Sequence, residues 1–168
     1  MSLCWYAIYT ASRAEKKVKQ ALDEAGIENY LPLQEKIRLW SDRKKKVKLP
    51  LIPSYIFVRI LSSDMGTVLK QRGVVCFIKE NGTPCSIPDC QMERFRKVVD
   101  NTEDEMDFTS QNIEIGDNIE IIRGELKGFV GELVEIRGKY KLAVRLEGIG
   151  CLLASVSISS VKKININL

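Results

Sequence analysis

The pattern of the sequence changes at an acidic stretch, and this change divides the chain into two differently built parts. Residues 1–99 contain 18 basic and 10 acidic residues, and their apolar residues alternate between helical and strand spacing. Residues 100–113 carry five acidic residues and no basic residue, whereas residues 114–168 hold seven of the eleven glycines among β-branched runs. We therefore expect an α/β domain, an acidic flexible linker and an all-β domain over these three ranges.

The first part is predicted to be an α+β sandwich of the ferredoxin-like kind. An aromatic run at 5–9 indicates a buried strand, and the spacing of Ser12 and Glu15 predicts a capping box for a helix that ends at Gly26. The remaining signals predict strands at 27–33, 55–61 and 74–78, a turn at Asn81-Gly82, and helices after Ser63 and from Pro88. The basic segment 34–54 is expected to protrude as a hairpin.

The last part is predicted to be a small five-stranded β-barrel of the SH3-like kind. Runs such as 119–122 and 133–136 are rich in β-branched residues, and glycines separate them. Arg137-Gly138 predicts a hairpin turn between two of the strands. Short strands at such close spacing are typical of a small barrel.

Several classes of function lack the residues that they need. The chain has no histidine, so Ser-His and Cys-His nucleophile pairs cannot form, and it has no phosphate-binding Gly-x-x-x-x-Gly-Lys-Ser/Thr motif. The five cysteines are odd in number and scattered, which favours reduced thiols over disulfides or zinc. We therefore expect a binding protein without catalytic activity, metal or cofactor. The start of the chain lacks a signal-peptide pattern and no long apolar run is present, which predicts a cytoplasmic protein.

A run of basic residues around Trp40 is the sharpest local feature of the chain. It comprises Lys36, Arg38, Arg43, Lys44, Lys45, Lys46 and Lys48. Clustered cations bind nucleic-acid phosphates by releasing counterions, and an aromatic side chain can stack on an unpaired base. A solvated hairpin tip explains the same run, because basic surface runs are common. Both interpretations stay open from the residues alone.

Two stretches in order along the chain resemble the NusG family. The first is the Trp5-Tyr6 strand and capped helix followed by Pro50-Leu51-Ile52-Pro53-Ser54-Tyr55-Ile56-Phe57-Val58, which is similar to the amino-terminal (NGN) domain of that family. The second, at 116–121 and 127–131, looks like its KOW motif. The stretch 50–58 and the sequence Trp40-Ser41-Asp42-Arg43-Lys44-Lys45 are more similar to specialised paralogues, such as RfaH and the UpxY antiterminators, than to housekeeping NusG. Ile52 and Ser54 depart from the aromatic residue and glycine that are frequent in housekeeping members.

The resemblance implies a non-catalytic, operon-specific regulator of transcription elongation or antitermination. Such a protein binds the clamp helices of RNA polymerase and suppresses pausing or termination. The positions that correspond to the family's polymerase-binding patch, with their neighbours, are Tyr6, Ile52, Pro53, Tyr55 and Phe57. The residues alone favour a core role for Tyr55 and Phe57, and the resemblance favours a contact role more strongly for Tyr55 than for Phe57.

Specialised members of the family also bind the non-template DNA strand. Arg13 and Arg72 correspond to this basic face by local motif, and helix geometry adds Lys16 and Lys17. The basic run adds three further candidates at its tip, namely Arg43, Lys44 and Lys45.

The resemblance gives the barrel a protein partner such as Rho or a small-subunit ribosomal protein. Its seven glycines oppose the helical form that this domain can take in RfaH, so we expect a constitutive barrel. A monomer is the simplest expectation. The alternative function is a general RNA-binding protein that does not act through polymerase, although the Lys/Arg-Gly-Phe/Tyr signature of an RNA-recognition sheet is missing.

Overall fold

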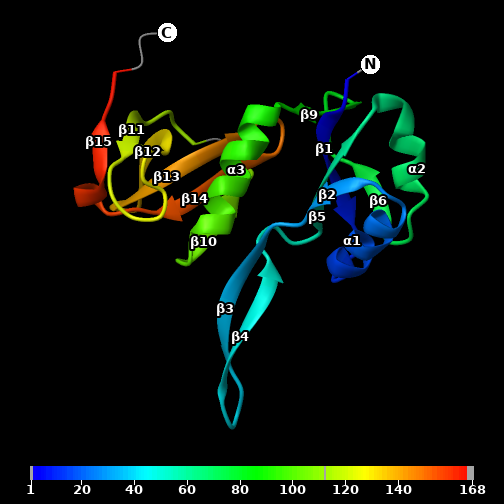
Figure 1. The fold of residues 1–168 in the computed structure, drawn as a ribbon, viewed down its shortest axis with the longest axis horizontal. Helices are drawn as coiled ribbons and strands as arrows, with labels where there is room; N and C mark the ends of the chain where they lie inside the picture. The colour runs from blue at the N-terminus through cyan, green and yellow to red at the C-terminus, as the bar shows by residue number, and fades with distance from the viewer. Residues whose placement is uncertain (1, 112, 166–168) are drawn as a thin grey trace.

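The computed structural model of the protein describes residues 2–111 and 113–165. In these residues two large sheets lie on either side of a helix, and two further sheets have two strands each. Figure 1 shows this helix, α3 (Asp89–Asn101), beside the second sheet, and a two-stranded hairpin that extends away from both halves. Among the described residues, no helix is long and apolar enough to cross a membrane. The mixed α and β architecture agrees with the predicted fold class.

The first sheet is antiparallel, with the order β2-β5-β1-β6, and β9 also pairs with β1. Its strands are β1 (Cys4–Thr10), β2 (Glu28–Tyr30), β5 (Tyr55–Ile60), β6 (Val74–Phe77) and β9 (Ser86–Ile87). Helices α1 (Glu15–Glu24) and α2 (Met65–Leu69) cover one face, where Ile8, Ile56 and Val18 are fully buried. Side chains alternate across each strand, so the other half of them, including those of Ala7 and Phe57, point to the opposite face. Helix α3 covers that face.

Helix α1 begins without the predicted capping box. Its first flanking residue is Ala14, which makes no side-chain cap, and Gly26 ends the helical segment with a φ of +69° as expected. The Glu15 side chain is buried, and its carboxylate instead accepts a hydrogen bond of 2.8 Å from the backbone N–H of Ser54. A partner 39 residues away therefore takes the carboxylate that local spacing assigned to the cap.

The protruding hairpin is present as predicted and is formed by β3 (Leu33–Leu39) and β4 (Lys44–Pro50). The expected strand at 27–33 is divided, since β2 ends at Tyr30 and β3 starts at Leu33, after Pro32. Pro32 has no N–H to donate to a strand ladder, and it lies where the chain leaves the first sheet and enters the hairpin. The turn at Asn81-Gly82 is confirmed: both residues have a positive φ, and they join β7 (Lys79–Glu80) to β8 (Thr83–Pro84).

The second sheet has six antiparallel strands in the order β10-β14-β13-β12-β11-β15. They are β10 (Met106–Thr109), β11 (Asp117–Ile121), β12 (Val130–Ile136), β13 (Lys139–Leu146), β14 (Gly150–Ser155) and β15 (Val161–Lys163), and short 3₁₀ turns lie at Ser62–Asp64 and Ile158–Ser160. The predicted Arg137-Gly138 turn joins β12 to β13, and both of its residues have a positive φ. Within the described residues the two edge strands do not pair with each other, so the sheet is not a closed barrel.

The acidic stretch expected as a flexible linker is ordered over part of its length. Helix α3 continues to Asn101, and β10 pairs with β14 from Met106 to Thr109. Met106 is only 2% exposed, and Phe108 packs against the same core. These apolar residues alternate with Asp107 and Thr109, which is a strand pattern that the local excess of acidic residues obscures.

Helix α3 joins the two sheets through one continuous hydrophobic core. The Phe95 ring lies edge-on to Phe57 of β5, Tyr30 of β2 and Phe108 of β10, at centroid distances of 5.4, 6.2 and 6.5 Å. Val98 on the same helix is fully buried in this cluster, which extends to the apolar residues of β13 and β14. The i, i+3, i+7 spacing of Met92, Phe95 and Val99 predicts one apolar face for this helix, and these residues are buried, but the buried Val98 makes the face wider.

A hydrogen-bonded ion pair fixes the segment before β11 to the outer face of the second sheet. Glu132 accepts hydrogen bonds from the Arg145 guanidinium at 2.7 and 2.8 Å and from the Gly116 N–H at 2.6 Å. Burial alone would raise the pKa of Glu132, but the hydrogen bonds and the charge of Arg145 outweigh it and hold the pKa below its ordinary value of 4.5. A Cβ on Gly116 would overlap the Leu133 carbonyl, so the approach requires glycine.

Replacing Glu132 with glutamine is expected to lower the free energy of unfolding by about 1–3 kcal/mol near neutral pH. A carboxylate whose pKa is lower in the folded state stabilises the fold above its unfolded pKa, and the effect disappears as the pH falls through the folded pKa. The stability difference between wild type and variant should therefore become smaller at pH values below 4.5, the ordinary pKa of this carboxyl group. Urea unfolding at a series of pH values measures it. Glu135→Gln, on an exposed position of the same strand, should change little; an equal loss there would contradict the prediction.

Candidate functional site

Two tyrosines form an aromatic surface at one end of the first sheet. Tyr9 of β1 pairs with Tyr55 of β5, and their rings meet edge to face at a centroid distance of 5.8 Å. Tyr9 is 41% exposed and Tyr55 is half-buried, while Pro53 in the preceding turn is exposed. Burial raises the pKa of Tyr55, and Tyr9 and Cys76 add to the shift, so its hydroxyl stays neutral at ordinary pH. The surface can therefore offer apolar area together with two hydroxyl groups.

The turn before Tyr55 is held in place by long-range hydrogen bonds. Ser54 has a φ of +64°, its N–H donates to the Glu15 carboxylate at 2.8 Å, and its carbonyl accepts from the Thr10 N–H at 2.8 Å. A positive φ is costly for a side-chain-bearing residue unless its surroundings fix it. Here helix α1 and strand β1 together fix the backbone that carries Pro53 and Tyr55.

Three of the predicted polymerase-binding residues do not reach the surface. Phe57 is fully buried beneath α3, and Ile52 is 5% exposed in the same core. Tyr6 is 7% exposed and packs on the opposite face of the sheet, edge-on to Phe77. Strand alternation explains the position of Tyr6, which points to the opposite side of the sheet from Tyr55, whereas Phe57 shares the face of Tyr55 and is covered by α3.

Tyr9 is the aromatic member that the sequence interpretation missed. It lies two residues beyond Ala7, which pairs with Phe57, so the side-chain period of a strand places it on the same face as Tyr55. Its neighbours on β6 are Cys76, which it pairs with, and the exposed Val75. The strand period in the aromatic run at 5–9 could have identified it.

The structure brings Arg13 and Arg72 to one corner of the first half. The Ala11 N–H donates to the Gly73 carbonyl at 2.8 Å, and Gly73 packs so tightly against Val18 that a Cβ there would lie 2.8 Å from its methyl group. Both arginine side chains are exposed on either side of this contact. The tight glycine contact thus places two cations beside the first turn of α1.

Lys16 and Lys17 extend this corner along α1 toward the hairpin. Both are exposed, and the Lys16 ammonium group donates to the Lys48 carbonyl of β4 at 3.0 Å. The three remaining candidates, Arg43, Lys44 and Lys45, lie at the exposed tip of the hairpin. Figure 1 shows that this tip extends away from the rest of the chain, so the predicted nucleic-acid residues form two separate groups.

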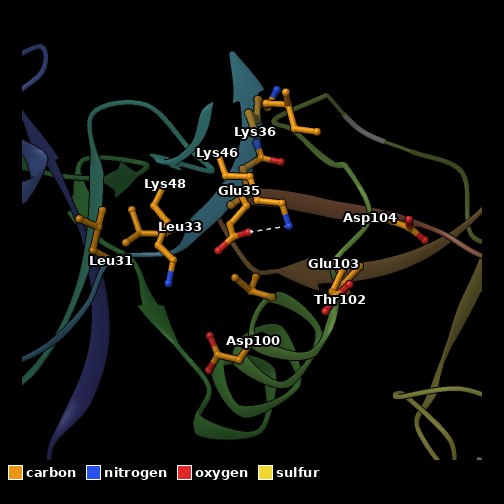
Figure 2. A pocket seen from close by; sticks show the side chains of 13 residues that line it. Leu31, Leu33, Glu35, Lys36, Lys46, Lys48, Asp100, Thr102, Glu103 and Asp104 are labelled. Atoms are coloured by element: carbon orange, nitrogen blue, oxygen red, sulfur yellow. Dashed lines mark ion pairs between the residues drawn. The ribbon is translucent and has the colours of Figure 1, made fainter. Parts of the chain in front are cut away.

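A groove of about 560 Å³ lies between the base of the hairpin and the chain after α3. Figure 2 shows lysines of the hairpin on one side and Asp100, Glu103 and Asp104 on the other. The Lys36 ammonium group bonds the Glu105 carboxylate at 2.9 Å, and the Tyr30 hydroxyl donates to Asp100 at 2.9 Å. Burial, followed by the nearby Asp100 charge, raises the pKa of Tyr30 and keeps this donor protonated. The acidic stretch therefore neutralises part of the hairpin base.

The residues that line the groove are charged, polar and aliphatic side chains. Among residues 2–111 and 113–165, no cluster of three or more His, Cys, Asp or Glu side chains could hold a metal ion. The arrangement as a whole offers an exposed aromatic surface and two groups of cations, which are suited to binding a protein surface and phosphates.

Comparison with known proteins gives this arrangement a family. The model of the family described as "Transcription termination factor nusG" matches residues 3–96. "Transcription termination/antitermination protein NusG" of Bacillus subtilis (strain 168) is 26% identical over 163 residues, which cover 86% of this chain and 89% of the relative. The protein of the same name from Rickettsia conorii is 27% identical, with coverage of 86% and 82%.

A solved structure has the same fold. The structure described as "Domain interaction in Thermotoga maritima NusG" covers 98% of this chain and 99% of its own chain, with a TM-score of 0.54 and 23% identity. The family model spans more than half of the chain, including β1, α1, the hairpin, the turn before Tyr55 and most of α3. The chain therefore belongs to the NusG family.

Proposed function

We propose that this protein regulates transcription elongation by binding RNA polymerase through the aromatic surface of its first sheet. The observation that carries the proposal is the Tyr9–Tyr55 pair, exposed beside a turn that Glu15 holds from a distance. Rigid aromatic residues on a fixed backbone are typical anchors of protein interfaces. The relatives, whose names describe termination and antitermination, support the same activity for this chain.

The contact on polymerase is proposed to be the clamp helices, with Tyr55, Tyr9 and Pro53 touching the partner. Phe57 and Ile52 are buried in the adjoining core, where they stabilise the strand and the turn that carry this surface. The corner formed by Arg13, Arg72 and the first turn of α1 is proposed to bind the non-template DNA strand by phosphate contacts. Such contacts add affinity once the protein is docked, because the second binding event is then intramolecular.

The second sheet is proposed to form a separate binding domain with its own protein partner, such as Rho or a small-subunit ribosomal protein. In this proposal residues 114–168 bind that partner while residues 1–99 bind polymerase. Action on particular operons, in the manner of specialised family members, is part of the same proposal.

The function is tested with a bacterial core RNA polymerase halted at a defined pause site. Addition of the full chain is expected to shorten the lifetime of the pause and to increase read-through at a downstream terminator. Free RNA with the sequence of the transcript, without polymerase, serves as the comparison ligand. If the chain binds that RNA tightly and leaves elongation unchanged, a general RNA-binding role replaces the proposal.

A further inference from the structure

The β3–β4 hairpin is an isolated ribbon with a regular register. Each strand has seven residues, and the pairing runs without interruption from Leu33–Pro50 to Leu39–Lys44. At about 3.3 Å per residue the ribbon is roughly 20 Å long. Figure 1 shows its outer part projecting beyond both sheets.

Cations lie on both faces of this ribbon. Side chains alternate, so Lys44 and Lys46 share one face with Ile37, while Arg38 and Lys45 share the opposite face. Arg38, Lys44 and Lys45 make no ion pair with any described residue, and the Lys46–Glu35 contact is long at 3.8 Å. The ribbon therefore presents uncompensated positive charge in two opposite directions.

Large apolar side chains stand exposed among these cations. Ile37, Leu39 and Trp40 are 63%, 76% and 61% exposed, although the rest of the chain buries most residues of this kind. An anionic membrane would be best met by one apolar face with cations at its rim. On this ribbon, however, each face carries cations.

We propose that the β3–β4 ribbon enters the major groove of duplex DNA. That groove is about 12 Å wide and admits a two-stranded ribbon, and phosphates line both of its walls. Cations on both faces then meet both walls, whereas a single strand lying along the ribbon would engage only one face. The exposed apolar side chains meet base edges and thymine methyl groups.

The same geometry excludes duplex RNA as an equal ligand. The major groove of A-form RNA is deep and narrow, so side chains on a ribbon cannot reach its floor. The proposal rests on the proposed function and refines it, because it assigns duplex DNA to the hairpin and leaves the single strand to the corner at Arg13 and Arg72. Its test uses no polymerase, so its failure is distinguishable from failure of the polymerase contact.

Fluorescence anisotropy with the full chain tests the proposal on a duplex DNA of about 20 base pairs, one of its single strands, and the RNA duplex of the same sequence. We expect the DNA duplex to bind at least about tenfold more tightly than the other two ligands. In the double variant Lys44→Ala with Lys45→Ala, which removes one cation from each face, duplex affinity should fall by about tenfold or more. The slope of log affinity against log salt should become shallower by about 2.

The matched control, Lys139→Ala with Lys162→Ala, removes two exposed lysines from the second sheet and therefore has the same net charge as the hairpin variant. It should bind the duplex within about twofold of wild type if phosphate contacts are local. The proposal would be overturned if the Lys44→Ala, Lys45→Ala variant kept its duplex affinity or lost duplex and single-strand affinity equally, or if the control variant showed the same loss. Vesicles of phosphatidylglycerol and phosphatidylcholine form the last arm; binding to them that duplex DNA does not compete away would assign the ribbon to membranes instead.

Discussion

Replacing Phe95 with alanine is expected to lower the free energy of unfolding of the whole chain by about 3–5 kcal/mol. The ring is fully buried and contacts aromatic residues of both sheets, so its removal leaves a cavity in the core that joins them. Because the cavity is shared, β5 and β13 should lose hydrogen-exchange protection together.

Chemical denaturation gives the total change, and hydrogen exchange resolved by strand gives its distribution. Tyr140→Ala is the control, since it truncates an aromatic side chain that is 41% exposed, and its cost should stay below about 1 kcal/mol. A Phe95→Ala variant that loses protection in β5 while β13 keeps it would show that the second sheet folds without α3.

Replacing Tyr55 with alanine is expected to weaken polymerase binding by about 2 kcal/mol, or roughly thirtyfold. The ring is half-buried against Tyr9 and contributes to the exposed surface, so the fold should lose only about 1 kcal/mol. Phe57→Ala should behave in the opposite way, with a loss of about 3–5 kcal/mol in stability. Titration of core polymerase with the labelled full chain, in parallel with thermal unfolding, separates the two effects.

The comparison between the two aromatic positions also provides the contradiction. If Tyr55→Ala binds polymerase as the wild-type chain does, the exposed aromatic surface is not the contact. If Phe57→Ala remains folded at the measuring temperature and still loses binding, the buried face must open when polymerase binds.

Features set by neighbouring residues could be predicted from the sequence. The turns at Asn81-Gly82 and Arg137-Gly138 and the helix end at Gly26 all depend on local backbone conformation, and each is confirmed by positive φ values. The strand at 55–61 is likewise correct within one residue, because its apolar run is short and bounded by turn residues. The mixed α and β class follows from these elements together.

Features that depend on distant partners could not be predicted in this way. Glu15 has the spacing of a capping residue, but its carboxylate serves Ser54 because the chain folds that turn onto α1. Val98 falls outside the single apolar face predicted for α3, since only the presence of a second sheet gives that side something to bury against. The strand at Met106 was not predicted because acidic residues surround it and its partner, β14, is distant in the sequence.

The candidate site shows the same division. Arg13, Arg72, Lys44 and Lys45 are exposed as their charge suggests, and Tyr55, which the family resemblance selects, is half-buried at the edge of the core. Spacing alone did not show that Tyr6 faces the opposite side of the sheet, although the register between β1 and β5 makes this plain. Side-chain alternation determines which face of the sheet a residue points to, and the position of α3 determines whether that residue is exposed.

The position of α3 also determines which hybrid proteins can be built from this family. Most of the helix lies within the amino-terminal region that the family model matches, yet Phe95 and Val98 complete the core of the second sheet. A chimera that joins residues 1–101 of this chain to the carboxyl-terminal part of a relative would pair one helix surface with a sheet that evolved against another. Its two parts would be compatible only if the exchange carried α3 together with the sheet that it covers.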